Sequence, residues 1–169
     1  MWSVGKTNGK VSRAVFLAAV NAAFLAVSAN AQDLSGLPAQ LLEKVEAAWQ
    51  ACSDLDNGQF AVEFGAVHRV DLDGDLYNNW VLDEARFACS SVPSMYCGTG
   101  GCVSHFLIGD NIDSLLNQGW DMAQIGPHRV LLANVHYSQC GGISPSPCVV
   151  ASVWDDDEMM WRSTEAKWE

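Results

Sequence analysis

The sequence predicts a mainly β domain of antiparallel sheets, with one N-terminal amphipathic helix and disulfide cross-links. Three observations lead to this fold class: a single early run of helical periodicity, a series of short β-favouring segments after it, and six cysteines behind an export-like leader. Helical segments do not alternate with the strand segments, which excludes a doubly wound α/β fold. We expect the sheets to form a sandwich or to be strongly curled.

The N-terminal residues have the order of an export signal. Three basic side chains precede an apolar stretch over residues 14–27, and Ala29-Asn30-Ala31 supplies the small-x-small pattern cleaved by signal peptidases. A membrane anchor is the alternative, but 14 apolar residues are fewer than the roughly 20 that span a bilayer. We therefore expect a cleaved signal peptide over residues 1–31, a single domain over 32–169, and a periplasmic or extracellular location.

The charge of the chain limits its partners. It carries 9 Lys and Arg against 20 Asp and Glu; the first 31 residues hold three of the basic and none of the acidic side chains, which leaves 6 against 20, a net charge of −14. This excess argues against nucleic-acid and anionic-membrane partners and favours a cationic protein or an envelope ligand. With 49% hydrophobic residues, the chain has enough apolar surface to form a core.

One helix is predicted over about residues 38–51. Apolar residues recur there at helical spacing, Pro38 suits the first turn, and Glu43, Lys44 and Glu46 lie on the other side. After the Asn57-Gly58 turn signal, alternation and β-branched residues predict strands between about residues 59 and 162. The predicted strands are 59–64, 66–70, 79–82, 103–108, 129–137, 149–154 and 159–162, with a hairpin turn at 155–157; residues 111–120 fit a short helix or a strand.

Six cysteines in an exported chain predict disulfides, and 15 pairings are allowed. Cys97 with Cys102 and Cys140 with Cys148 would each close a short loop that contains glycine or proline, which leaves Cys52 for Cys89. That last bridge closes the longest loop and would stabilise the fold by about 3 to 4 kcal/mol in the chain-entropy model. The four residues between Cys97 and Cys102 do not match the Cys-x-x-Cys spacing of redox sites.

Residues 71–79, which we name the acidic loop, are the strongest candidate for a ligand site. Aspartates at the first, third and fifth positions of a tight loop can converge on one hard cation, and oxygens from the seventh and ninth positions complete its shell. The predicted ligands are the carboxylates of Asp71, Asp73 and Asp75, the carbonyl of Tyr77 and the side chain of Asn79. All are oxygen ligands, so calcium is the expected ion.

The acidic loop resembles the calcium loops of FG-GAP and dockerin-type modules, with departures. Leu76 occupies the sixth position, where those loops have glycine, Asn79 replaces a carboxylate, and Leu82 stands where an EF-hand has its bidentate glutamate. The expected affinity is therefore weak, about 0.1 to 1 mM, as in extracellular modules. The alternative is an acidic turn without metal.

A wider pattern of cysteines and glycines is similar to that of a group of small exported bacterial proteins whose activity is uncharacterised. It consists of Val70-Asp-Leu-Asp-Gly-Asp, Val81-Leu-Asp-Glu-Ala-Arg-Phe-Ala-Cys89, Met95-Tyr-Cys-Gly-Thr-Gly-Gly-Cys102 and Val135-His-Tyr-Ser-Gln-Cys-Gly-Gly142. The resemblance covers most of residues 50–162. It implies an envelope location and no particular reaction.

Other chemistry is weakly indicated. The four histidines lack the spacing of a metal pair, and zinc on His136 and Cys140 competes with a disulfide. A carboxylate pair drawn from Asp83, Glu84 and the acidic turn (residues 155–158) would suit a small envelope hydrolase. Trp154, Trp161 and Trp168 would form an interaction face if exposed, but they more often fill the core of a small sheet.

These observations favour a non-enzymatic binding or structural protein of the envelope or the secreted space, with a calcium-stiffened loop. Its ligand is not named by any motif. The alternatives are a small hydrolase and, since the charge and the compartment suit it, an inhibitor of a basic secreted enzyme such as a lysozyme.

Overall fold

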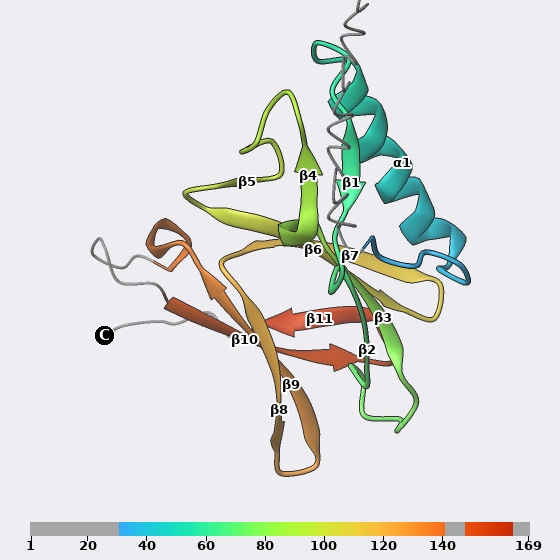
Figure 1. Cartoon of the computed structure of the whole chain (residues 1–169). Coiled ribbons are helices and arrows are strands. Elements are labelled where there is room, and N and C mark those ends of the chain that lie inside the picture. The colour runs from blue at the N-terminus through green and yellow to red at the C-terminus, as the bar shows by residue number, and fades with distance from the viewer. Residues whose placement is uncertain (1–30, 141–147, 164–169) are drawn as a thin grey trace, which may run out of the picture.

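A computed structural model describes residues 31–140 and 148–163 of the chain. The predicted signal peptide lies outside these residues, apart from Ala31, and so does Trp168. Figure 1 shows a helix packed on one side of a set of antiparallel strands. The elements are α1 (Ala39–Ser53), β1 (Phe60–Val62), β2 (Val67–Val70), β3 (Asn79–Asp83), the 3-10 turn η1 (Glu84–Arg86), β4 (Phe87–Cys89), β5 (Cys97–Gly98), β6 (Gly101–Ile108), β7 (Asn111–Asn117), β8 (Trp120–Ile125), β9 (His128–Val135), the 3-10 turn η2 (Tyr137–Gln139), β10 (Cys148–Asp155) and β11 (Met160–Ser163).

Helix α1 confirms the predicted helix and extends two residues past its expected end. Pro38 stands at the N-cap, where its missing N–H leaves no donor unsatisfied. Leu41, Ala48 and Cys52 are buried, because they share the face that packs on the strands. No helix in the part of the chain that the structure describes has the length and hydropathy needed to cross a membrane.

The strands form three antiparallel groups. Strands β1 and β4 pair with each other, β2, β3, β5, β6 and β7 form a five-stranded sheet, and β8 to β11 form a four-stranded sheet in the order β11-β10-β9-β8. Residues 111–120, for which the sequence allowed two structures, are strand β7 and the start of β8. Strands β4, β5 and most of β8 were not predicted; β4 and β5 are only three and two residues long, too short for a periodicity to appear.

Strand β6 is the centre of the fold, because both of its faces are buried. Leu107 packs toward α1, in a cluster with Leu41, Leu82 and Phe87. The neighbouring Phe106 points to the opposite face and packs between the sheets with Leu72, Val81, Leu131 and Trp154. The molecule therefore has a layer of α1 with the β1–β4 pair, the five-stranded sheet, and the four-stranded sheet, with a core on each side of the middle layer.

Three disulfides cross-link the chain in the pairing that the sequence favoured. Cys52 in α1 is joined to Cys89 in β4, Cys97 to Cys102, and Cys140 to Cys148, so that no cysteine of the chain is free. The first bridge fixes the helix to the strands. Disulfides of this number are typical of proteins that mature outside the reducing cytoplasm.

Candidate functional site

The acidic loop connects β2 to β3, and the structure brings its three aspartates together. One carboxylate oxygen from each of Asp71, Asp73 and Asp75 lies within 4.8 Å of the other two. Each carboxylate also accepts one backbone N–H from farther along the loop: Asp71 from Gly74 at 2.7 Å, Asp73 from Asp75 at 3.3 Å, and Asp75 from Tyr77 at 2.7 Å. These short-range hydrogen bonds turn the three side chains toward one point.

The other two predicted ligands lie beside this cluster and hold the loop in shape. The side-chain oxygen of Asn79 accepts the Leu72 N–H at 2.7 Å, while its amide nitrogen lies 3.4 Å from Asp73 Oδ2. In this arrangement Asn79 orients Asp73 and does not present its oxygen to the cluster. Tyr77 uses its N–H on Asp75, and its ring is exposed. Leu76, at the sixth position, has a φ of 72°, the left-handed conformation that glycine adopts most readily.

The electrostatics of the acidic loop are those of crowded negative charge. The pKa of Asp73 is raised above its ordinary value, first by partial burial of the carboxyl and also by the negative charge of Asp75, against the lowering effect of hydrogen bonds from the Asp75 N–H and Asn79. Two arginines reach this loop: Arg129 Nε lies 3.9 Å from Asp71 Oδ2 and donates to the Asp71 carbonyl at 3.1 Å, and Arg69 Nη2 donates to the Asn78 carbonyl at 2.7 Å. A hard cation would relieve this repulsion with the oxygen ligands it prefers.

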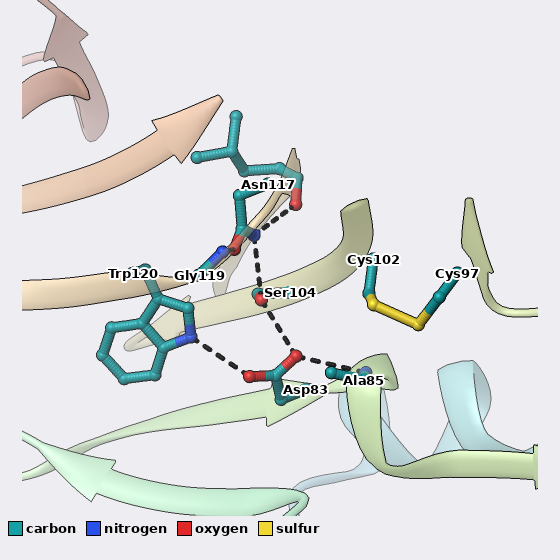
Figure 2. The surroundings of a disulfide bond; sticks show 9 residues. Asp83, Ala85, Cys97, Cys102, Ser104, Asn117, Gly119 and Trp120 are labelled. Atoms are coloured by element: carbon teal, nitrogen blue, oxygen red, sulfur yellow. Dashed lines mark hydrogen bonds between the residues drawn. A yellow bond between two sulfur atoms is a disulfide. The ribbon is translucent and has the colours of Figure 1, made fainter. Parts of the chain in front are cut away.

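A second polar cluster lies between the two sheets, next to the Cys97–Cys102 disulfide (Figure 2). One oxygen of Asp83 accepts from the Ala85 N–H and from Ser104 Oγ, both at 3.2 Å, and the other faces Trp120 Nε1 at 3.4 Å. Asn117 in turn donates to Ser104 Oγ at 2.9 Å. This network ties β3, β6, β7 and β8 together and forms a wall of a cleft of about 380 Å³.

Gly101 shows how tightly the chain is packed at that cleft. Its φ is +107°, and a Cβ placed on it would lie within van der Waals overlap of the Asn117 backbone carbonyl. The close approach of β6 to the end of β7 therefore requires glycine at position 101 of the Cys97–Cys102 loop.

Asp83 and Glu84, two of the acids from which the alternative of a carboxylate pair was drawn, bond to side chains on opposite faces of the sheet. Asp83 binds Ser104 on the face between the sheets, whereas Glu84 binds His105, the next residue along β6, on the α1 face. The acidic turn begins at Asp155, the last residue of β10, which binds Arg162 of β11 at 3.0 Å.

A hydrogen-bonded chain through His105 was not foreseen in the sequence. The His105 ring is 4% exposed; its Nδ1 lies 2.7 Å from Ser114 Oγ and its Nε2 lies 2.8 Å from Glu84 Oε1. Ser114 is exposed on β7 and is the cross-strand partner of His105. A histidine between a carboxylate and a hydroxyl has the connectivity of an activated serine, since the carboxylate holds one ring nitrogen protonated and the other nitrogen can take the hydroxyl proton.

The tryptophan hypothesis is answered for two of its three residues. Trp154 is 8% exposed and packs edge-on against Trp161 in the core between the sheets, with ring centroids 5.7 Å apart. Trp154 lies in the core and Trp161 packs against it, as the sequence favoured, because both lie on the inward face of β10 and β11. Trp168 lies outside the described residues.

Comparison of the chain with protein-family models, with curated proteins and with solved structures finds no match.

Proposed function

We propose that this chain is an exported binding protein of the periplasm or the extracellular space, in which the acidic loop takes up a calcium ion. The observation that carries the proposal is the convergence of the Asp71, Asp73 and Asp75 carboxylates within 4.8 Å. Calcium suits an all-oxygen site on a flexible loop, and it is abundant outside the cytoplasm. The three disulfides support an oxidising compartment.

The ion would act on the conformation of the acidic loop. Three converging carboxylates repel one another, and a divalent cation replaces that repulsion with attraction. Leu72 follows Asp71 and is fully buried between the sheets, so a change at the cluster reaches the core directly. With few fixed ligands, we expect a dissociation constant of about 0.1 to 1 mM.

Calcium titration of the oxidised protein tests this proposal. After treatment with EDTA, calorimetry and thermal melting are compared for the wild type, Asp73→Asn and Asp156→Asn. The last variant removes the same charge from the acidic turn and is the matched control. At 10 mM calcium we expect about 1.4 to 2.7 kcal/mol of stabilisation, or roughly 4 to 10 °C, in the wild type and Asp156→Asn, and neither heat nor shift in Asp73→Asn. An equal response of all three proteins would overturn the proposal.

The proposed partner is cationic, because the domain after residue 31 carries a net charge of −14. A basic secreted enzyme fits this charge and the proposed compartment. Lysozyme is a suitable probe: an inhibitor would lower its activity at near-equimolar concentration, and salt would weaken the effect through screening. Binding that leaves the enzyme active would instead indicate an acidic docking surface.

A second candidate function, ester hydrolysis at Ser114, is favoured by the Ser114–His105–Glu84 chain. Ser114 Oγ would attack the ester carbonyl while its proton passes to His105 Nδ1. That proton would then go to the departing alcohol as the C–O bond breaks, and water would release the acyl group by the same route. Glu84 would hold His105 in the required tautomer.

The chain contains its own control for this second candidate. Ser138 Oγ also lies 2.8 Å from a histidine Nδ1, that of His136, but the described residues give His136 no carboxylate partner. Diisopropyl fluorophosphate followed by mass spectrometry is expected to label Ser114 and not Ser138, and His105→Gln should abolish the labelling. Absence of labelling at Ser114, or equal labelling of both serines, would remove this candidate.

A further inference from the structure

A groove of about 710 Å³ lies between α1 and β1, which run side by side in the fold (Figure 1). Helix α1 contributes Leu42, Val45, Glu46 and Trp49 to its lining, and β1 contributes Phe60 and Val62. Cleavage of the predicted signal peptide after Ala31 would leave all of these residues in place. The groove shares no lining residue with the acidic loop or with the Ser114–His105–Glu84 chain.

The wall that α1 gives to this groove is an exposed apolar stripe. Leu42, Val45 and Trp49 follow one another at spacings of three and four residues, which places them on one face of the helix. Leu41 and Ala48, the residues before Leu42 and Trp49, belong to the neighbouring stripe, which is buried. Leu42 is 41% exposed and Trp49 is 50% exposed. The apolar face of α1 is therefore wider than its packing on the strands requires.

The floor of the groove belongs to the rigid part of the fold. Val62 is buried in the core between α1 and the strands, and Val45 and Phe60 pack against that core. The disulfide from Cys52 in α1 to Cys89 in β4, the strand that pairs with β1, fixes the distance between the two walls. A preformed groove costs little conformational entropy when a ligand enters it.

The charge around the groove selects its occupant. Glu46 is exposed at the rim, and among the described residues it forms no ion pair. The domain after residue 31 carries a net charge of −14, so a second copy of the chain and an anionic lipid surface would both be repelled. An apolar side chain next to a basic one matches both the stripe and Glu46.

We infer that this groove is the docking site for the cationic partner and takes up a segment in which a large apolar side chain lies beside lysine or arginine. The apolar side chain would cover Leu42 and Trp49, and the basic group would pair with Glu46. Exposed tryptophans in such grooves are frequent centres of binding energy. The inference rests on the proposed function only for the charge of the partner, and it needs neither calcium nor a reaction at Ser114.

Short blocked peptides test the two halves of this recognition separately. The first alternates leucine with lysine, the second replaces leucine with serine, and the third replaces lysine with glutamate. Binding to the oxidised, exported protein is measured by nuclear magnetic resonance titration in EDTA. We expect the leucine–lysine peptide to bind with a dissociation constant of about 0.1 to 1 mM. The serine–lysine peptide should bind at least about fivefold more weakly, and the leucine–glutamate peptide should not bind.

Matched variants on the protein locate the site. Leu42→Ser should weaken binding of the leucine–lysine peptide about three- to tenfold. Leu55→Ser is its control, since Leu55 is 45% exposed but does not line the groove. Glu46→Gln should weaken binding about two- to fivefold, and high salt should remove this difference. Glu43→Gln removes the same charge from an exposed position of α1 outside the groove, and it should change the affinity less than about twofold.

The outcomes also separate this inference from the proposed function. Peptide or lysozyme binding that Leu42→Ser and Glu46→Gln leave unchanged would overturn the groove and keep a cationic partner. Failure of both lysozyme and the cationic peptides to bind would remove the two together. A dimer that Leu42→Ser dissociates in sedimentation would assign the groove to a second copy. Peptide binding that appears only after residues 1–31 are removed would assign it to that segment of the chain, and either result would overturn the inference.

Discussion

Two connections between antiparallel strands are rich in aspartate, and they accommodate negative charge differently. In the acidic turn, Asp155 collects three donors: the backbone N–H groups of Asp157 at 3.1 Å and Glu158 at 3.0 Å, and Arg162 Nε at 3.0 Å. These bonds, first that from Glu158 and then that from Arg162, lower the pKa of Asp155. The acidic turn therefore stabilises the ionised form of the Asp155 carboxyl.

In the acidic loop there are fewer hydrogen-bond donors for each carboxylate than in the acidic turn. Three carboxylates each accept one backbone N–H, and Arg129 approaches only Asp71. Burial and the charge of Asp75 raise the pKa of Asp73, so ionised Asp73 is disfavoured in the folded protein. The two connections therefore differ in the number of hydrogen-bond donors per carboxylate more than in the number of aspartates. The acidic turn stabilises its Asp155 carboxylate with its own donors, whereas the acidic loop would gain stability from an added cation.

The two connections should differ most in how much an apolar side chain in each contributes to the free energy of unfolding. Leu72, in the acidic loop, is fully buried between the sheets, whereas Met159, at the end of the acidic turn, is 47% exposed. Leu72→Ala should lower the free energy of unfolding by about 2 to 5 kcal/mol, because it leaves a cavity in the core. Met159→Ala should change it by no more than about 0.5 kcal/mol. Urea unfolding measures both, and similar losses would show that the two connections are anchored alike.

A smaller effect, of opposite sign in the two connections, is expected when single charges are removed without calcium. At pH 7 in EDTA, Asp73→Asn should leave the melting temperature unchanged or slightly raised, because it removes an anion that the fold disfavours. Asp155→Asn should lower it, because it weakens three hydrogen bonds to an anion. Asp156→Asn measures the effect of charge alone. A clear loss of stability in Asp73→Asn would mean that its hydrogen bonds outweigh the repulsion.

The two arginines should differ in their effect on calcium. Arg129 lies at the acidic loop and competes with a bound cation for Asp71, so Arg129→Gln is expected to tighten calcium binding by about two- to fivefold. Arg162 serves Asp155 in the other connection, and Arg162→Gln should leave calcium affinity unchanged. Titration calorimetry with calcium measures the affinity of both variants. Weaker calcium binding in Arg129→Gln would show that its bond to the Asp71 carbonyl is needed to shape the acidic loop.

The features that could be predicted from the sequence are those that depend on residues close together in the chain. Helix α1, the main strands and the disulfide partners were predictable because each depends on local periodicity or on a short loop between cysteines. The convergence of Asp71, Asp73 and Asp75 was predictable for the same reason, since their spacing lies within one loop. That Asn79 would turn its oxygen to Leu72 was not, because it depends on the competition between a backbone donor and an ion.

The features that sequence reasoning missed are made by strand register. His105 meets Ser114 because β6 and β7 pair at that register, and Glu84 reaches the same ring from η1. The pairing of His105 with Ser114 cannot be predicted from the spacing of residues in the sequence. Strand β8 was missed because its inward side chains, Trp120 and Met122, alternate over too few residues to exclude a loop. The signal that could have helped is His105 itself, a histidine within an otherwise apolar run.

The smallest expected effect is the pH dependence that separates Asp73 from Asp155. Asp73 has a raised pKa in the folded state, so its stabilising contribution is complete below the unfolded value of about 3.8 and is lost as pH rises through the folded pKa. Asp155 has a lowered pKa, so its contribution is present above about 3.8 and is lost as pH falls through the folded pKa. In calcium-free urea unfolding, any advantage of Asp73→Asn over the wild type should therefore disappear as pH falls from 7 to about 4, whereas the deficit of Asp155→Asn should persist at pH 4 and shrink only below it. If both differences change over the same pH range, the two connections do not differ in the way that their donors indicate.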